Sequence, residues 1–143
     1  MASVDDLFTT LGPDDLWKIY SDVSGIFRGG GNSTEPKLLG PKGPRSRDFT
    51  IVFDPTHGLE IALPDPTKGL SFSDSIERLQ GLRIKGIVWR LPKGALLPRG
   101  LVFNCRDRSH PLLNVSVPTS VIELTAKLTV LSRQLISTRV EIR

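Results

Sequence analysis

Glycine and proline interrupt this chain at such short intervals that long helices have little room to form. The 143 residues include 13 Gly and 11 Pro, and both residue types favour turns over regular structure. They are densest between Gly29 and Asp48, where eight of twenty residues are Gly or Pro and only Leu38 and Leu39 can be buried. A loop this long inside a compact domain is usually functional or disordered. We therefore predict one domain spanning residues 1–143, with residues 29–48 as a mobile basic loop inserted within it.

Short apolar runs between these turns predict the strands. The expected strands are Phe49–Phe53, Leu59–Leu63, Ile87–Leu91, Leu101–Cys105, Leu112–Ser116 and Thr138–Ile142. The first two are separated by Asp54–Gly58, which has the composition of a turn, so they should form a hairpin. The last strand is expected at a sheet edge.

Two or three helices are expected beside these strands. Ser120 and Glu123 have capping-box spacing at the start of a helix that should continue to Leu131. Ser71 or Ser73 is expected to cap a shorter helix. Its apolar side would hold Phe72, Ile76 and Leu79, and it would end at Gly81. The segment Leu16–Tyr20 fits a helix or a short strand. The sequence thus predicts an α+β domain with mainly antiparallel strands.

Composition excludes several kinds of site. One cysteine permits no internal disulfide and no thiolate zinc centre, and two histidines leave little for any other metal site. Cys105 lies among apolar neighbours and is expected to be an inert thiol. No Walker loop or dinucleotide fingerprint is present. No basic apolar leader and no run of about 20 apolar residues occurs. We therefore expect synthesis in the cytoplasm and export, if any, without a cleaved leader.

Polar side chains flank strand-like segments at three separated places. The first is Phe27-Arg28-Gly29, where a guanidinium at a strand end offers a planar fork of donors to a phosphate or carboxylate. The second is Ser71-Phe72-Ser73, with hydroxyls at alternate positions before a helix N-terminus. The third is the turn between Asn104 and Asn114, which includes Arg106, Asp107 and His110. Each also has an ordinary reading, as a solvated arginine, a helix cap or a polar hairpin.

The order and spacing of these places resemble the mono-ADP-ribosyltransferase pattern. More specifically, residues 64–132 resemble the type VI secretion effector toxins with an ADP-ribosyltransferase-like fold (Tse-type toxins). The segments that carry the resemblance are Lys68–Ser75, Val88–Gly94, Leu97–Asn104, His110–Val115 and a helix over Ser120–Leu131. Ile26–Gly30 is a shorter match to the first strand of that family. The resemblance implies a split, strongly twisted antiparallel sheet with NAD bound in its cleft.

The resemblance also implies roles for individual residues. It implies three catalytic residues, Arg28, Ser71 and His110. Arg28 would hold the diphosphate or the nicotinamide ribose, and Ser71 would support that ribose. As residues binding NAD, the substrate, it implies Phe27, Arg28, Gly29, Ser71, Phe72, Ser73, Asn104 and Asn114. In this set Phe72 would stack on nicotinamide and Ser73 would assist or cap the helix. Lys37, Lys42, Arg45 and Arg47 in the basic loop would attract the phosphates.

One departure from the family pattern limits this expectation. Such transferases place a glutamate on a late strand to stabilise the developing ribosyl cation, whereas no Glu lies between Glu77 and Glu123 here. His110 or Asn114 would have to act at the ribose instead. The alternative is an inactive member of the same fold that binds a nucleotide or a protein.

The implied partners follow from the toxin reading. They are NAD, an unknown macromolecular target in the cytoplasm of a recipient cell, and a cognate immunity protein. The formal charge of +4 also permits a nucleic-acid partner. That partner is not favoured, because the basic residues are scattered along the sequence and aromatic residues are few.

Overall fold

A computed structural model of the chain describes residues 2–3, 25–92, 95–104 and 110–143. The segment Leu16–Tyr20 and the residues Cys105, Arg106 and Asp107 lie outside these ranges, so the predictions made for them stay predictions. In chain order the elements are β1 (Ala2–Ser3), β2 (Gly25–Gly31), β3 (Thr50–Asp54), β4 (Leu59–Leu63), β5 (Leu70–Ser71), α3 (Ile76–Gly81), β6 (Gly86–Pro92), β7 (Leu96–Leu97), β8 (Leu101–Asn104), β9 (Leu112–Val115), β10 (Thr119–Ser120), α4 (Val121–Ser132) and β11 (Ile136–Ile142).

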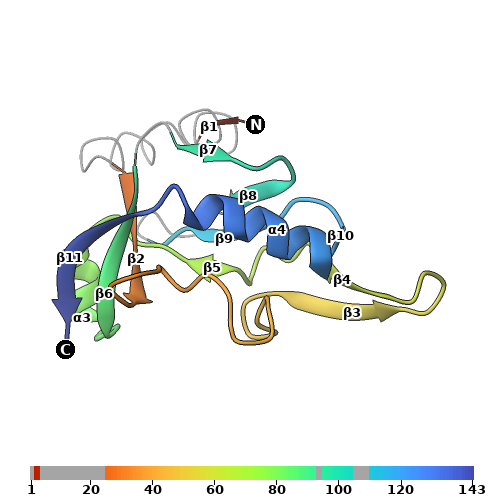
Figure 1. Ribbon diagram of the computed structural model, residues 1–143, viewed down its shortest axis with the longest axis horizontal. Coiled ribbons are helices and arrows are strands. Elements are labelled where there is room, and N and C mark those ends of the chain that lie inside the picture. The colour runs from red at the N-terminus through yellow and green to blue at the C-terminus, as the bar shows by residue number, and fades with distance from the viewer. Residues whose placement is uncertain (1, 4–24, 93–94, 105–109) are drawn as a thin grey trace.

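The strands form three small sheets and one two-stranded pair. The three sheets have the orders β11-β6-β2, β5-β9-β8 and β10-β4-β3, and β1 pairs with β7. All strand pairs within the described ranges are antiparallel. Sheet β11-β6-β2 lies at one end of the molecule and the β3–β4 hairpin projects at the other (Figure 1). The predicted α+β class and the mainly antiparallel pairing are confirmed.

Two of these sheets are joined through a single backbone bridge. Phe27 in β2 donates its N–H to the Ser73 carbonyl at 2.8 Å, and Ser73 returns the bond at 2.7 Å. Ser73 follows β5, so the bridge links sheet β11-β6-β2 to sheet β5-β9-β8. It also fixes how Arg28, the residue after Phe27, lies relative to Ser71 at the end of β5.

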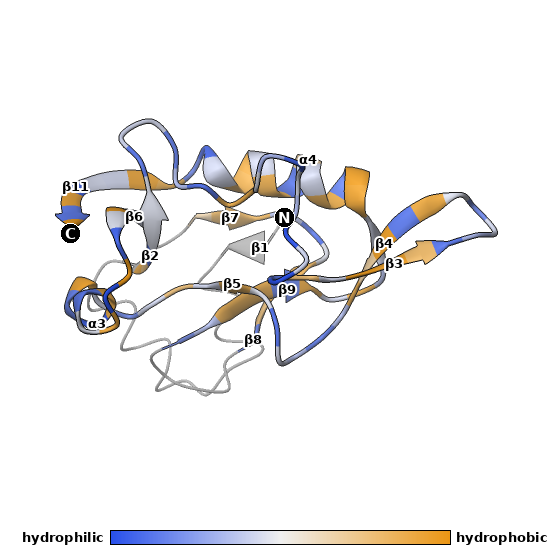
Figure 2. Cartoon of the chain, turned by 90° about the horizontal axis from the view of Figure 1, so that it is seen from below, coloured by the Kyte–Doolittle hydropathy of each residue, from blue (hydrophilic) through white to orange (hydrophobic). Residues whose placement is uncertain are grey.

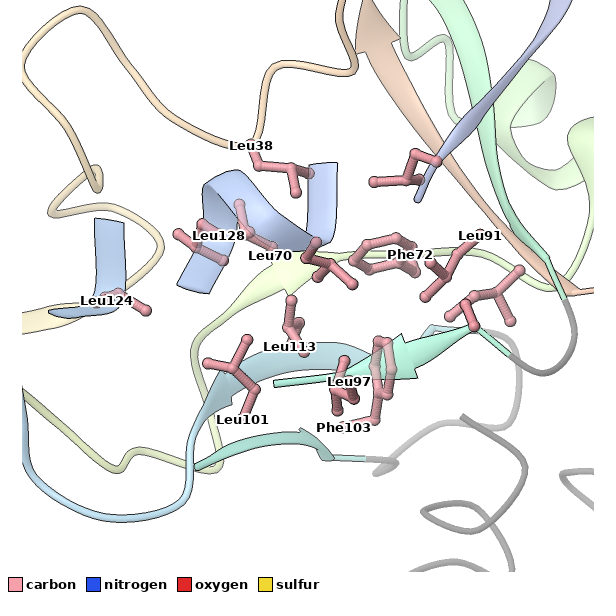
Figure 3. Packing of buried hydrophobic residues seen from close by; sticks show 14 of the residues in the cluster. Leu38, Leu70, Phe72, Leu91, Leu97, Leu101, Phe103, Leu113, Leu124 and Leu128 are labelled. Carbon is pink, nitrogen blue, oxygen red and sulfur yellow. The ribbon is translucent and has the colours of Figure 1, made fainter. Parts of the chain in front are cut away.

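Most of the core lies between helix α4 and the sheets (Figure 3). Leu124, Leu128 and Leu131 recur at helical spacing on α4, and all three are fully buried. Phe72 is also fully buried and meets Phe103 edge to face, with ring centroids 5.5 Å apart. A second, smaller cluster lies where β2 and β6 pack against α3, and its buried members are Phe27, Leu79, Val88 and Ile142.

Elements whose signals are local in the sequence formed as predicted. The hairpin β3–β4 pairs Thr50 with Leu63 and Asp54 with Leu59. Helix α4 begins after Ser120, whose hydroxyl accepts the Glu123 N–H at 3.1 Å as an N-cap does. Strand β11 lies at the edge of its sheet.

The start of the short helix was predicted wrongly. The N-cap of α3 is Ser75, whose hydroxyl accepts the Arg78 N–H at 3.2 Å, and not Ser71 or Ser73. Ser71 pairs with Leu112 of β9, and Ser73 bridges to Phe27. Those long-range pairings hold the chain extended through Ser73, so Phe72 precedes the helix and does not form part of its apolar side.

The glycine run after Arg28 continues β2 and is not the start of the loop. A Cβ on Gly31 would lie 2.6 Å from Cδ1 of Trp89, and one on Gly29 would lie 2.7 Å from Cγ2 of Ile84. Strand β2 can therefore approach β6 this closely only because these residues lack side chains. The pairing register shifts between Arg28 and Gly31, which marks an irregularity at the end of β2 next to Arg28.

The basic loop is tied to the rest of the fold at several points. Leu38 is 2% exposed and belongs to the main core. Trp89 Nε1 donates to the Asn32 carbonyl at 2.9 Å, and Gly40 and Gly43 exchange two backbone hydrogen bonds. The loop runs from β2 to β3 between the two ends of the molecule (Figure 1).

Candidate functional site

Arg28 is the best-defined polar side chain of the site. Its Nη1 donates to the Ser71 carbonyl at 2.9 Å. The side chain as a whole is partly buried, but its Nε is fully buried and has no hydrogen-bond partner within the described part of the chain. A buried N–H without an acceptor is costly in a folded protein. Because Nε is shielded from solvent, an anionic ligand would have to bind this guanidinium through its Nη nitrogens.

The surroundings of Arg28 disfavour its charge. The pKa of Arg28 is lowered to about 10, chiefly by burial and next by the nearby Arg45, while Asp48 opposes this effect and Arg47 adds to it. The guanidinium still carries its charge at neutral pH. Because neighbouring cations repel it, a bound anion would gain more here than at an isolated surface arginine.

Ser71 joins Arg28 to His110. Its carbonyl accepts from Arg28, and its hydroxyl lies 3.2 Å from His110 Nε2. Which of these two groups donates depends on the histidine tautomer. Residues 28, 71 and 110 come from three distant segments, and the fold brings all three together. The Arg28 guanidinium thus lies beside Ser71, but it bonds the carbonyl of that residue and not the hydroxyl.

A cavity of about 310 Å³ opens beside this group. Its lining, which we call the Arg28 cavity, comprises Arg28, Gly29, Gly30, Lys37, Arg45, Arg47, Asp48, Ser71 and Ile84. Its volume is at the lower end of the range for small-molecule sites, roughly 300–1,000 Å³. Four of these side chains are cationic, and the one carboxylate in the lining, Asp48, accepts from Arg45 Nε at 2.7 Å. The arrangement suits a phosphate-bearing ligand.

Three other residues of the expected site lie away from the cavity. Phe72 is fully buried in the main core, and Phe27 belongs to the cluster against α3. Neither ring is available to stack on a ligand, because each is already packed against other side chains. Ser73 is also fully buried, and its hydroxyl donates to the Ser75 carbonyl at 3.1 Å. We therefore assign these three residues to packing and local structure.

The two asparagines do not line the Arg28 cavity. Asn114 is fully buried, and its amide donates to the carbonyls of Asp65 and Lys68 at 3.1 and 3.0 Å. It holds the turn before β5 and does not reach a ligand. Asn104 ends β8 opposite Leu112.

Sequence reasoning missed two wall residues, Asp48 and Ile84. Asp48 follows Arg45 by three residues, which is a spacing that pairs side chains across a turn and was a usable signal. Ile84 follows α3 and reaches the cavity only through the packing of α3 near β2, so nothing in its sequence neighbourhood indicates it. Lys42, expected beside Arg45 and Arg47, lines a neighbouring cavity instead.

No family model matches this chain, and no curated protein or solved structure matches it either. The chemistry of the site must therefore be argued from its own geometry. Within residues 2–3, 25–92, 95–104 and 110–143, no three His, Cys, Asp or Glu side chains gather as a metal site. Neither described helix combines the length and hydropathy needed to cross a membrane.

Proposed function

We propose that this protein is a toxin that binds NAD in the Arg28 cavity and transfers ADP-ribose to a molecule of the target cell. The observation that carries the proposal is that Arg28 and Ser71 line one cationic cavity, while His110, which is outside that lining, lies within hydrogen-bond distance of the Ser71 hydroxyl. The same residue types, in the same chain order, underlie the resemblance to ADP-ribosyltransferase-like effector toxins. The bridge between two antiparallel sheets at Phe27 and Ser73 is compatible with the split sheet of that fold.

Residues of the site contact different parts of NAD in this proposal. An Nη nitrogen of Arg28 donates to a diphosphate oxygen, and the charges of Lys37, Arg45 and Arg47 hold the diphosphate in the cavity. The Ser71 hydroxyl hydrogen-bonds the ribose next to nicotinamide. His110 positions that hydroxyl through its contact with Oγ, whereas Arg28 bonds the carbonyl of the same residue.

The reaction breaks the bond between C1′ of the ribose and the nicotinamide nitrogen. The electron pair of that bond leaves with nicotinamide, which becomes neutral, and a lone pair of the acceptor forms the new bond to C1′. The acceptor proton passes to water or to the imidazole of His110. The transition state has the character of a ribosyl cation, as in glycoside hydrolysis.

A second function is favoured by the lack of a free carboxylate. Asp48 is the one carboxylate among the cavity residues, and it is engaged by Arg45. Loss of one well-placed electrostatic group typically lowers a rate by about 10²–10³-fold. An inactive member of the same fold, which binds the nucleotide or a protein without turnover, is therefore the alternative.

Nicotinamide release from NAD by the purified protein separates these two functions. We expect release by the wild-type protein and a fall of at least about 100-fold in Arg28→Ala, because the principal phosphate donor is lost. Ser71→Ala should lower the rate by a smaller factor. Arg99→Ala and Ser116→Ala are matched controls, since both residues are exposed and neither lines the Arg28 cavity.

Each outcome of this assay has a definite meaning. NAD binding without nicotinamide release supports the inactive module. Equal losses in Arg28→Ala and Arg99→Ala would contradict the proposed site. Expression in a bacterial host gives a second test, because the wild-type protein should arrest growth and Arg28→Ala should relieve the arrest. An immunity protein and delivery into the cytoplasm of another cell belong to the same proposal.

A further inference from the structure

Two of the cavities lined by the basic loop share a wall, and the Arg28 cavity is one of these two. The second, which we call the loop cavity, has a volume of about 630 Å³ and is walled by residues 40–46 together with Ile51 and Glu60. Arg45 belongs to both linings. The two cavities are therefore neighbours with a shared cationic wall.

A third cavity continues from the loop cavity onto the projecting hairpin. This hairpin cavity has a volume of about 410 Å³ and shares Ile51 and Glu60 with the loop cavity. It is lined further by Phe53 of β3 and by Ile122 at the start of α4. The three linings adjoin through Arg45 and through Ile51 and Glu60, and we call this series, which ends at the exposed ring of Phe53, the path.

The charge along this path exceeds what a single diphosphate requires. Residues 36–47 contain four cations and no carboxylate. Lys42 lines the loop cavity and not the Arg28 cavity, so a ligand confined to the Arg28 cavity does not account for it. Asp48 and Glu60 are the two carboxylates on the cationic part of the path, and Asp48 is paired with Arg45.

The loop presents these cations on an ordered backbone. Gly40 and Gly43 exchange backbone hydrogen bonds of 2.9 and 3.1 Å around Lys42. Lys68 Nζ donates to the Ser46 carbonyl at 2.8 Å and so attaches the far side of the loop to the turn before β5. Fixed cations lose less conformational entropy on binding than cations on a free segment would.

The hairpin adds an aromatic side chain to the end of the path. Phe53 is 64% exposed, and it lies two residues from Ile51 on the same face of β3. The hairpin projects from the body of the molecule and carries apolar residues on both strands (Figure 2). A cationic groove combined with exposed aromatic rings is the arrangement that binds single-stranded nucleic acids, because bases stack on the rings while the backbone follows the charges.

We propose that a single-stranded nucleic acid binds along this path, with its phosphates against Lys42 and Arg45 and a base stacked on Phe53. The sequence analysis did not favour such a partner, but four cations lie within residues 36–47, and two of them, Lys42 and Arg45, line the loop cavity. As a binding surface the proposal stands independently. That the bound strand is also the acceptor of ADP-ribose rests on the proposed function.

Fluorescence anisotropy with a labelled single-stranded RNA of mixed sequence tests the surface. The affinity should fall steeply with salt, with a log–log slope of about −2 if some three phosphates are neutralised. Lys42→Glu should weaken binding about fivefold or more and flatten the slope by about 0.7 or more. Arg99→Glu is the matched control, since Arg99 is exposed and lines none of the three cavities.

Phe53→Ala tests the stacking contact. We expect at least about fivefold weaker binding with an unchanged salt slope, because one base contact is lost and no charge is changed. Val130→Ala is the control, since Val130 is exposed on α4 and lines none of the three cavities. A duplex of the same sequence should bind more weakly, because its bases cannot stack on Phe53.

The outcomes separate this surface from the NAD site. Loss of RNA binding in Lys42→Glu with unchanged nicotinamide release supports both proposals. RNA binding without any NAD binding would retain the surface and refute the proposed function. The surface is refuted if RNA does not bind, if binding is insensitive to salt, or if Arg99→Glu weakens it as much as Lys42→Glu. Transfer of label from NAD to an acidic protein but not to RNA would refute the role as acceptor.

Discussion

The cluster beneath α4 and the Arg28 cavity differ in how well their buried groups are compensated. In the cluster, apolar side chains such as Phe72, Leu113 and Leu128 are fully buried and pack against one another. In the cavity, a buried guanidinium nitrogen lacks an acceptor and like charges lie close together. Residues of the first kind stabilise the fold, whereas those of the second kind lower its stability unless an anion binds. The difference indicates where the molecule functions.

The largest change in the free energy of unfolding should come from creating a cavity in the cluster beneath α4. Phe72→Ala removes a fully buried ring that meets Phe103, and we expect it to lower the free energy of unfolding by about 3–5 kcal/mol. Urea denaturation followed by circular dichroism measures this. Phe53→Ala is the control, because Phe53 is 64% exposed and its loss should cost at most about 0.5 kcal/mol. Similar losses in the two variants would mean that the cluster is not packed as described.

Gly86→Ala tests the close strand contact that positions Arg28. Gly86 has a φ of +105°, and a Cβ there would lie 2.8 Å from the Gly31 carbonyl oxygen. We expect a loss of about 1–3 kcal/mol and weaker anion binding, because β2 must shift. Gly81→Ala should be neutral or slightly stabilising, since a Cβ there meets no atom within 4 Å. A neutral Gly86→Ala would contradict the strand geometry.

Arg28→Met should stabilise the protein, whereas most substitutions destabilise one. We expect it to raise the free energy of unfolding by about 1–2 kcal/mol, because it removes a charge that is poorly compensated. The pKa of Arg28 is lowered from its ordinary value to about 10. The destabilisation is therefore fully present well below pH 10 and is relieved only as the pH rises through about 10 towards the ordinary pKa of arginine. The gain in Arg28→Met should accordingly stay constant between pH 5 and 9.

The ligand response of the same variant provides the complementary measurement. Pyrophosphate should raise the melting temperature of the wild-type protein and leave that of Arg28→Met unchanged. If Arg28→Met is less stable than the wild type, the guanidinium stabilises the fold. That result would contradict the statement that the Arg28 cavity, unlike the cluster beneath α4, lowers stability.

The smallest effect concerns acid stability at the turn before β5. Hydrogen bonds from Thr67 lower the pKa of Asp65 below its ordinary value of 3.8, and bonds from Thr50 act in the same direction. A carboxylate with a lowered pKa stabilises the fold above its unfolded pKa, and this contribution disappears as the pH falls through the folded pKa. Asp65→Asn should therefore show a shallower loss of melting temperature below about pH 4. Identical pH profiles would exclude this contribution.

Sequence reasoning located elements whose signals are local and failed where distant contacts decide. The β3–β4 hairpin and the Ser120 cap depend on neighbouring residues, and both were predicted correctly. Ser71 and Ser73 resemble helix caps by sequence, but their pairing with β9 and β2 keeps them extended. Phe72 was expected to face a ligand, yet strand alternation turns it into the core.

The candidate site shows the same division. Arg28 and Ser71 were selected from the sequence through chain order and residue type, and the fold brings them within hydrogen-bond distance. The wall formed by Asp48 and Ile84 arises from packing between segments far apart in the chain. Patterns within a short window of sequence do not carry that information.

A structure of the protein with NAD or ADP-ribose bound tests the central claim most directly. We expect the ligand in the Arg28 cavity, with a diphosphate oxygen about 2.7–3.2 Å from an Nη nitrogen of Arg28 and the ribose beside the Ser71 hydroxyl. A ligand bound elsewhere, without contact to Arg28, would contradict it.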